Sequence, residues 1–472
     1  MFSARLNLIG LLFLMVLGSC QIDDVNSPSP GDTFIKYYGG DGSQLGRGMI
    51  YLENDANFII YGAQNRAEDG STANLYILRV DEQGNELDEV SIDFSSAIDS
   101  LNINAADDTP GSLIYDETLG FIYVGSSTRA DAIDGGTYDV LIWAQINVEL
   151  DSTPVASGEI TQLDIEVNID GDTTITALRD VSGLDVVVSG ENQILVVGST
   201  TKIQDGDLTV AADDDETQIY TALIDITDGT VIRERTNGFT GNDVGLYIDQ
   251  FGEDDFVIVG TTENRVGTEG TNAYFLPINA NGVPLEGSSI GFSTNGNVAA
   301  PDRSANETVQ DVFKRPNGYV ITGASVRGGE THPYFINVSY FGNGNFALDV
   351  ADTISVVAEA PAGEDNLTLT SQNLNAAGTA ITIADNGNYF VAGSILRYPT
   401  KNAEILIMQS DQGGDLISGS VRNFGLASGN DAANEIIALS DGSLLVLTTV
   451  DFGSGNFLMG LLKVNQNGDL MN

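Results

Sequence analysis

Apolar residues recur along the chain in short runs separated by turns rich in glycine, asparagine and aspartate, a pattern typical of β-strands joined by tight turns. One run, FIIYGAQ beginning at Phe58, has six related copies later in the chain, at fairly regular intervals. Regular repetition of this kind, without a helical pattern, predicts a repeat architecture built from small sheets. The copies are FIYVGSS at Phe121, ILVVGST at Ile194, FVIVGTT at Phe256, YVITGAS at Tyr319, YFVAGSI at Tyr389 and LLVLTTV at Leu444.

Each copy lies inside a larger unit. An apolar run and a short turn precede it, as in GMIYL and ENDAN over residues 48–57, and a loop, a third apolar run and a second turn follow it. Six of the seven second turns contain glycine, which suits the positive φ at the centre of tight hairpins; the ELDST turn at residues 149–153 is the exception. The unit therefore predicts a four-stranded antiparallel meander.

The ends of the repeated region indicate how the sheets are arranged. The seventh unit reaches VNQNGDLMN without a fourth strand, whereas FIKYYGGDG at residues 34–42 precedes the first unit. We expect residues 34–38 to pair with the strand around residues 458–464, which completes the last sheet and removes its exposed edge. The sequence thus predicts an all-β fold, a single seven-bladed β-propeller over residues 33–472, with six or eight blades as the nearest alternatives.

Residues 1–32 have a different character. Residues 1–19 combine Arg5 with an apolar core at residues 8–17, which is shorter than the roughly 20 residues needed to span a bilayer, and therefore predict a cleaved signal peptide. The LGSC sequence that ends at Cys20, the single cysteine, resembles the lipobox of bacterial lipoproteins. That resemblance implies that Cys20 carries acyl chains such as palmitate, and residues 20–32 then form a flexible linker.

Two further resemblances concern location and family. Asp23 and Asp24, directly after the lipobox, resemble the surface-export signal of Bacteroidota lipoproteins. This implies a protein anchored in the outer membrane and facing the cell exterior, with the periplasmic face as the alternative. The repeats themselves resemble the degenerate propeller repeats of bacterial secreted and surface proteins, a structural motif that brings no catalytic residue with it.

The charge of the chain limits the classes of molecule that can bind it. With 67 acidic and 19 basic residues, the formal net charge is −48, which excludes nucleic acid as a partner because nucleic-acid binding needs a basic surface. Such a charge attracts divalent cations and basic proteins, although it also serves simply to keep a secreted protein soluble. Ca²⁺ is therefore the candidate cofactor.

Calcium prefers six to eight oxygen ligands, which loops rich in Asp and Asn supply. The VNIDGDTT loop has an alternating triad of such residues around a glycine, but it lacks the downstream Glu of an EF-hand, so ordinary turn chemistry is the alternative. A run of three aspartates in the longest loop adds further oxygens. The candidate calcium ligands are Asn168, Asp170, Asp172, Asp213, Asp214 and Asp215.

Catalytic chemistry has little support in the sequence. His332 is the single histidine, so a zinc site built on histidines or a Ser-His-Asp triad has few residues to use. We expect a non-catalytic surface lipoprotein whose propeller binds a protein or glycan partner; the Bacteroidota resemblance implies an outer-membrane β-barrel or another envelope protein. The alternative is a carbohydrate-active lyase or glycosidase with two carboxylates about 5 to 9.5 Å apart at the central pocket. Among 67 acidic residues, the sequence alone does not single out such a pair.

Overall fold

The computed structural model describes most of the predicted propeller domain. The predicted signal peptide, Cys20, Asp23 and Asp24 lie outside the described residues, as do the six candidate calcium ligands. The description covers residues 33–470 except 41, 66–72, 95–107, 131–136, 168–172, 202–215, 239–240, 264–269, 286–289, 294–295, 298–305, 328, 343–344, 354–374, 397–401, 426–428 and 454–455.

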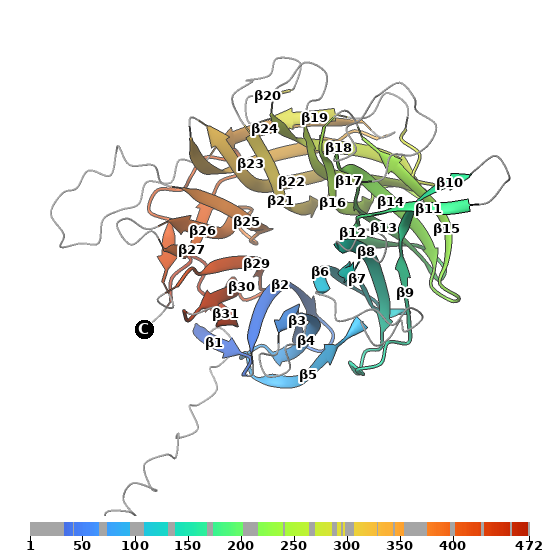
Figure 1. Ribbon diagram of the computed structural model, residues 1–472. Helices are drawn as coiled ribbons and strands as arrows, with labels where there is room; N and C mark the ends of the chain where they lie inside the picture. Colours follow the sequence, from blue (N-terminus) through green and yellow to red (C-terminus); the bar gives the residue numbers. More distant parts are fainter. Residues whose placement is uncertain are drawn as a thin grey trace, which may run out of the picture.

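Seven antiparallel sheets are arranged around a common axis, so the chain is a seven-bladed β-propeller (Figure 1). The first strand of each blade lies nearest the axis, and the following strands lie progressively outward. Blade 1 contains β2 (Ser43–Leu52), β3 (Asn57–Asn65), β4 (Asn74–Asp81) and β5 (Glu86–Ile92). Blade 2 contains β6 (Asp108–Asp116), β7 (Gly120–Ala130), β8 (Thr137–Ile146) and β9 (Ala156–Ile160). Blade 3 contains β12 (Val181–Gly190), β13 (Gln193–Thr200), β14 (Gln218–Asp225) and β15 (Thr230–Asn237).

The remaining blades follow the same order. Blade 4 contains β16 (Asp243–Gln250), β17 (Asp255–Glu263), β18 (Thr271–Asn279) and β19 (Ile290–Ser293), extended by β20 (Gly296–Asn297). Blade 5 contains β21 (Asn306–Arg315), β22 (Gly318–Arg327), β23 (Glu330–Tyr340) and β24 (Phe346–Thr353). Blade 6 contains β25 (Ala376–Ile383), β26 (Tyr389–Leu396), β27 (Ala403–Ser410) and β28 (Arg422–Phe424). Blade 7 contains β29 (Ala432–Ala438), β30 (Leu444–Asp451), β31 (Phe457–Val464) and, from the other end of the chain, β1 (Phe34–Tyr38).

The N-terminal strand closes the ring, as predicted. β1 pairs antiparallel with β31, from Phe34 opposite Lys463 to Tyr38 opposite Met459. Phe34 and Tyr38 are buried, and the Tyr38 hydroxyl donates a hydrogen bond of 2.8 Å to the carbonyl oxygen of Gly84 in blade 1. The strand therefore connects the last blade to the first.

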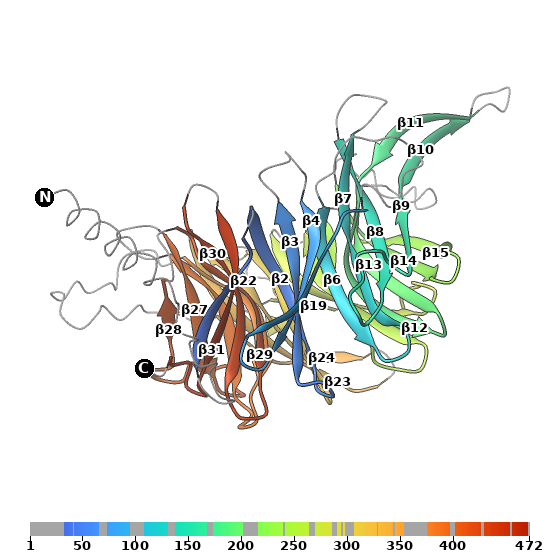
Figure 2. The ribbon, with the colours of Figure 1, turned by 90° about the horizontal axis from the view of Figure 1, so that it is seen from below.

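Among the strands that the structure describes, one pair does not belong to any blade. Strands β10 (Gln162–Val167) and β11 (Thr173–Arg179) form a separate two-stranded sheet between blades 2 and 3. This hairpin projects beyond the ring in both views (Figure 1, Figure 2).

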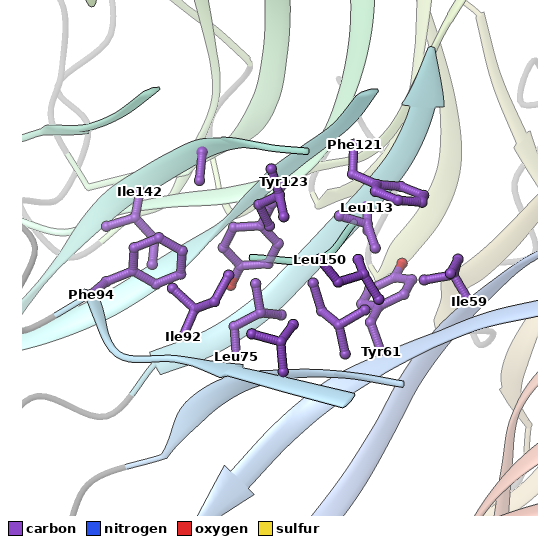
Figure 3. Packing of buried hydrophobic residues seen from close by; sticks show 14 of the residues in the cluster. Ile59, Tyr61, Leu75, Ile92, Phe94, Leu113, Phe121, Tyr123, Ile142 and Leu150 are labelled. Carbon is purple, nitrogen blue, oxygen red and sulfur yellow. The ribbon is translucent and has the colours of Figure 1, made fainter. Parts of the chain in front are cut away.

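Apolar side chains between neighbouring blades form the core. Between blades 1 and 2, Ile59 and Leu75 face Leu113 and Phe121, with the Phe94 and Tyr123 rings stacked 5.4 Å apart (Figure 3). Similar clusters lie between the other blades, so the core is continuous around the ring. Trp143 of blade 2 is part of this core.

The turn glycines have the conformation that the repeat predicts. In the six glycine-containing second turns, one glycine has a φ between 71° and 88°, in the left-handed region. In the ELDST exception, Leu150 adopts a φ of 57°, and its buried side chain packs in the core of blades 1 and 2. Apolar burial thus stabilises a backbone conformation that leucine rarely adopts. Within the described ranges, no helix is long and apolar enough to cross a membrane.

Candidate functional site

Every axial strand contains a β-bulge at the same position. The register between the first and second strands of each blade skips one residue, so this extra residue has no partner on the second strand. A bulge bends the strand and changes the direction of the side chains beside it. In this protein the affected side chains belong to the strands nearest the propeller axis. The extra residues are Arg47, Gly111, Leu184, Leu246, Gln310, Thr379 and Asn434.

The repeated glycine of the sequence motif is explained by this bulge. In six blades that glycine pairs with the residue just before the bulge, for example Gly198 with Gly183. A Cβ atom at Gly198 would lie 1.7 Å from the carbonyl oxygen of Ser182, and Gly260 is equally crowded by the oxygen of Val244 at 1.9 Å. In these six blades the bulge therefore leaves no room for a side chain on the residue opposite it. Blade 7 has the buried Thr448 at this position and still contains a bulge.

Side-chain hydrogen bonds join each blade to the next near the bulges, and together they form an inter-blade ring around the axis. The ring uses hydroxyl groups, two aspartates and one arginine, bonded mostly to backbone groups of the adjacent blade. Its seven contacts are Arg47 Nε to Gly111 O (2.9 Å), Ser112 to the Asp185 carboxylate, Ile248 N to Asp185 Oδ2 (2.8 Å), Val309 N to Thr261 Oγ1 (3.1 Å), Ile381 N to Asp311 Oδ2 (2.7 Å), Thr379 Oγ1 to Ala433 O (2.7 Å) and Gly46 N to Thr449 Oγ1 (3.1 Å).

Four charged side chains of blades 1, 3, 5 and 7 form what we call the axial cluster: Arg47, Asp185, Asp311 and Glu435. Arg47 interacts electrostatically with all three acids, and Asp311 interacts with Glu435. These residues come from first strands of blades on different sides of the ring (Figure 1), so their mutual interactions place the four side chains near the axis. Arg47 itself is exposed and forms no direct ion pair with a described residue.

Burial raises the pKa of each acid in the axial cluster. The pKa of Asp185 rises to about 6, with burial outweighing the hydrogen bonds from the Ile248 amide and Ser112. Burial also raises the pKa of Asp311, although Arg47 and two backbone amides favour its charged form. The pKa of Glu435 is raised well above its usual range by burial and then by the neighbouring Asp311. The surroundings of the cluster therefore make the protonated form of each acid easier to reach than it is in water.

The hydrogen bonds of these acids limit what they do chemically. Both oxygens of Asp311 accept backbone N–H groups, from Val312 and Ile381 at 2.7 Å each. Asp185 likewise accepts the Ile248 amide of the next blade. Glu435 is partly exposed and, within the described part of the chain, accepts a bond only from the amide of Ile436 at 3.1 Å. Two of the three acids therefore connect blades, and Glu435 alone retains an oxygen that can reach a ligand.

The structure places few of the residues singled out from the sequence. Cys20, the Asp23–Asp24 pair and all candidate calcium ligands lie outside the described residues, so those predictions remain predictions. Among the residues that are described, no group of three or more His, Cys, Asp or Glu side chains is arranged to hold a metal ion. His332 lies on β23 with Nε2 3.5 Å from a carboxylate oxygen of Glu330, and its side chain is largely covered.

Sequence reasoning missed the axial cluster, although a signal for it exists. Asp185 precedes Gly198 by the same interval as Glu435 precedes Thr448, the equivalent of that glycine. Asp311 lies one position closer to its own glycine, Gly323. Aligning the units on the repeated glycine therefore places all three acids at nearly the same point of the repeat, and each directly follows the extra residue of its bulge.

Replacing Asp185 with Asn is expected to stabilise the protein at pH 8 and to leave it unchanged near pH 4. The folded state binds the Asp185 proton more tightly than the unfolded state, whose pKa is near 3.8. Stability is therefore lost as the pH rises from about 4 to about 6, and the difference corresponds to about 3 kcal/mol. The Asn oxygen still accepts the Ile248 amide. Thermal melting of both proteins from pH 4 to pH 8 measures the effect.

The control for this experiment is Asp254→Asn, which makes the same charge change at an exposed position of blade 4. Loss of any one negative charge reduces the electrostatic repulsion within a chain whose net charge is −48, and this control measures that general effect. If Asp185→Asn melts below the parent protein at pH 8, the ionised carboxylate stabilises the inter-blade ring and the expected sign is wrong.

Similarity to known proteins concerns the architecture alone. No protein-family model matches the chain, and no curated protein matches it significantly. Solved structures similar to it include the Dos1 propeller (10% identity, 91% of this chain and 95% of that chain, TM-score 0.42) and Drosophila Semaphorin 1a extracellular domains 1-2 (9%, 93% and 88%, 0.45). A Penicillium chrysogenum α-L-arabinanase complexed with arabinobiose is similar as well (12%, 93% and 99%, 0.41). At such low identity the likeness extends to the β-propeller fold and no further.

Proposed function

We propose that the protein is a non-catalytic propeller scaffold that binds a partner. The observation that supports this is the inter-blade ring, because it engages two of the three axial acids in hydrogen bonds to the adjacent blade. A glycosidase needs two carboxyl groups that both reach the substrate, one as acid and one as base or nucleophile. Asp311, with both oxygens bonded to backbone amides, is poorly suited to either role.

The proposal includes a location. Cys20 anchors the protein in the outer membrane, and the Asp23–Asp24 pair directs it to the cell exterior, where a protein or glycan partner binds. The sequence supports this through the LGSC lipobox and the short linker at residues 20–32. The partner is an outer-membrane β-barrel or another envelope protein, to which the tether holds the propeller close.

Cys20→Ala is expected to abolish lipid labelling, because Cys20 is the single cysteine of the sequence and its thiol is the group that the lipobox resemblance assigns to acylation. Cells that express either protein are fed a clickable fatty acid, and the label on the purified protein is measured. Ser19→Thr, which keeps the cysteine, is the comparison. Label that persists on Cys20→Ala would contradict the anchoring part of the proposal.

One observation favours the alternative of a carbohydrate-active enzyme. Glu435 is partly exposed, carries a raised pKa and lies near Arg47, which are properties of a general acid at a binding site. A single carboxyl group of this kind would need a second group to complete the reaction.

A hydrolysis assay distinguishes the two functions. The purified protein is expected to release no reducing sugar from a panel of polysaccharides at pH 5 and pH 7, and to match Glu435→Gln in this respect. Glu253→Gln, at an exposed turn of blade 4, is the control variant. Sugar release that Glu435→Gln abolishes and Glu253→Gln retains would make the protein an enzyme.

A further inference from the structure

A groove lies between the outer strands of blades 2 and 3, far from the axial cluster. Its volume is about 450 Å³, and the two strands beside it, β9 and β15, are each the last strand of their sheet. The projecting β10–β11 hairpin begins at Gln162, directly after the groove residue Thr161, so this hairpin is adjacent to the groove. The groove is lined by Glu159, Ile160, Thr161, Val231, Ile232, Arg233 and Glu234.

The edge of β15, like the outer edge of blade 1, carries both apolar and charged side chains, but only β15 lies beside the groove. β5 begins with Glu86 and has further acids at Asp88 and Glu89, which discourage pairing with another strand. β15 exposes Val231 and Ile232, which are 36% and 43% accessible, just as β5 exposes Leu87 at 52%. β15 is eight residues long and exposed over its first five. An exposed and partly apolar edge of this length is a template for one more strand, although the register shift beside Ile232 narrows the region available.

The charges in the groove indicate what kind of strand fits there. Glu159 pairs with Arg129 at 3.8 Å, and Glu234 accepts a hydrogen bond of 2.9 Å from the Tyr220 hydroxyl. Arg235, just beyond the groove, donates to the carbonyl oxygen of Asn281 in blade 4. Arg233 forms no hydrogen bond or ion pair with any residue for which the structure gives a position. The neutral Tyr220 hydroxyl leaves the charge of Glu234 in place, so Arg233 is distinguished by its lack of a partner among the described residues and not by a positive net charge of the groove. The complement of its guanidinium is a carboxylate.

We propose that this groove binds an extended segment of a partner protein, which adds a strand to the edge of β15 and places one carboxylate against Arg233. Apolar residues on either side of that carboxylate pack on Val231 and Ile232. The net charge of −48 disfavours a strongly acidic segment, and it also disfavours a second copy of this chain as the occupant. The inference rests on the proposed binding function and specifies its site.

Synthetic peptides test the site directly. The probe is a fluorescein-labelled ten-residue peptide of alternating threonine and valine with one central aspartate, and binding to the mature chain is followed by fluorescence anisotropy. We expect it to bind at least tenfold more tightly than the same peptide with lysine at the centre. N-methylation of alternate amides is expected to abolish binding, because it removes the donors that pair with β15.

Variants of the protein connect the binding to Arg233. Arg233→Glu is expected to reverse the preference, so that the lysine peptide binds more tightly than the aspartate peptide. The same charge reversal at the exposed Lys314 of blade 5 controls for the change in the overall electrostatic field of the protein. It is expected to leave the preference for the aspartate peptide unchanged. Melting temperatures of both variants confirm that they are folded.

Several outcomes would overturn the proposal. They are equal binding of the aspartate and lysine peptides, undiminished binding of the N-methylated peptide, and no binding of any peptide at about 1 mM. Dimers in sedimentation velocity that Arg233→Glu dissociates would make a second copy the occupant. If any of these results is obtained and the protein is also inactive in the hydrolysis assay, only the proposed peptide site is rejected. The proposed scaffold function is then retained.

Discussion

Removal of residues 21–38 is expected to destabilise the propeller severely, whereas removal of residues 21–31 is expected to have almost no effect. The longer deletion removes β1 and exposes the edge of β31 and part of the core between blades 7 and 1. Burial of Phe34 and Tyr38 alone contributes about 3 to 6 kcal/mol, at about 1.5 to 3 kcal/mol for each side chain. The shorter deletion removes only residues that the sequence predicts to form a linker. Urea unfolding and thermal melting measure the difference.

Adjacent residues of the same strand provide a finer version of this experiment. Tyr38→Ala removes a buried ring and its hydrogen bond to Gly84, and about 3 kcal/mol or more is expected to be lost. Tyr37→Ala is the control, because the Tyr37 side chain is 42% exposed, although it contacts Phe452 edge to face. If both deletions and both substitutions melt like the parent protein, β1 does not close the ring.

Gly198→Ala is expected to cost about 3 kcal/mol, which is the second large effect. The new Cβ would lie 1.7 Å from the Ser182 carbonyl oxygen, so the two strands would have to separate at the bulge. Overpacking costs about 1 to 3 kcal/mol and sometimes more, and here the obstructing atom belongs to the backbone and cannot rotate away. Urea unfolding of the purified variant gives the change in the free energy of unfolding.

The matched control is Gly190→Ala in the same blade. A Cβ there would first meet the end of the Gln193 side chain at 3.5 Å, an ordinary contact. Its unfolding is therefore expected to remain close to that of the parent protein. Equal effects of the two substitutions would show that the glycine opposite the bulge is needed for its backbone flexibility and not because a Cβ atom lacks space.

The repeat was predictable from the sequence because its determinants are local. Each hairpin is specified by an apolar run and a glycine turn a few residues away, so positions such as Gly84 and Gly229 could be recognised without knowledge of the fold. The pairing of residues 34–38 with β31 followed from counting strands, since one sheet lacked a fourth strand. The positive φ of Leu150 could not be predicted from the residues of its turn, because packing of its side chain in the core stabilises that conformation.

The axial cluster was not predicted, because it depends on contacts between blades. Arg47 and Glu435 belong to the first and last blades of the sequence, and only closure of the ring brings them together. The bulges were equally hidden, since the glycine motif is visible in the second strand whereas its physical cause lies in the first. The groove depends on where the outer strands of blades 2 and 3 end, and no single repeat contains that information.

Closure by β1 also determines the order of events when the protein folds. β1 is made before every blade, yet its partner β31 is the last strand that the structure describes. Blades 1 to 6 are able to form one after another as they are synthesised, but β1 stays unpaired until blade 7 exists. Contacts over such a separation are slow to form because they close a very long loop. We therefore expect the final refolding phase to be slow and to depend on β1.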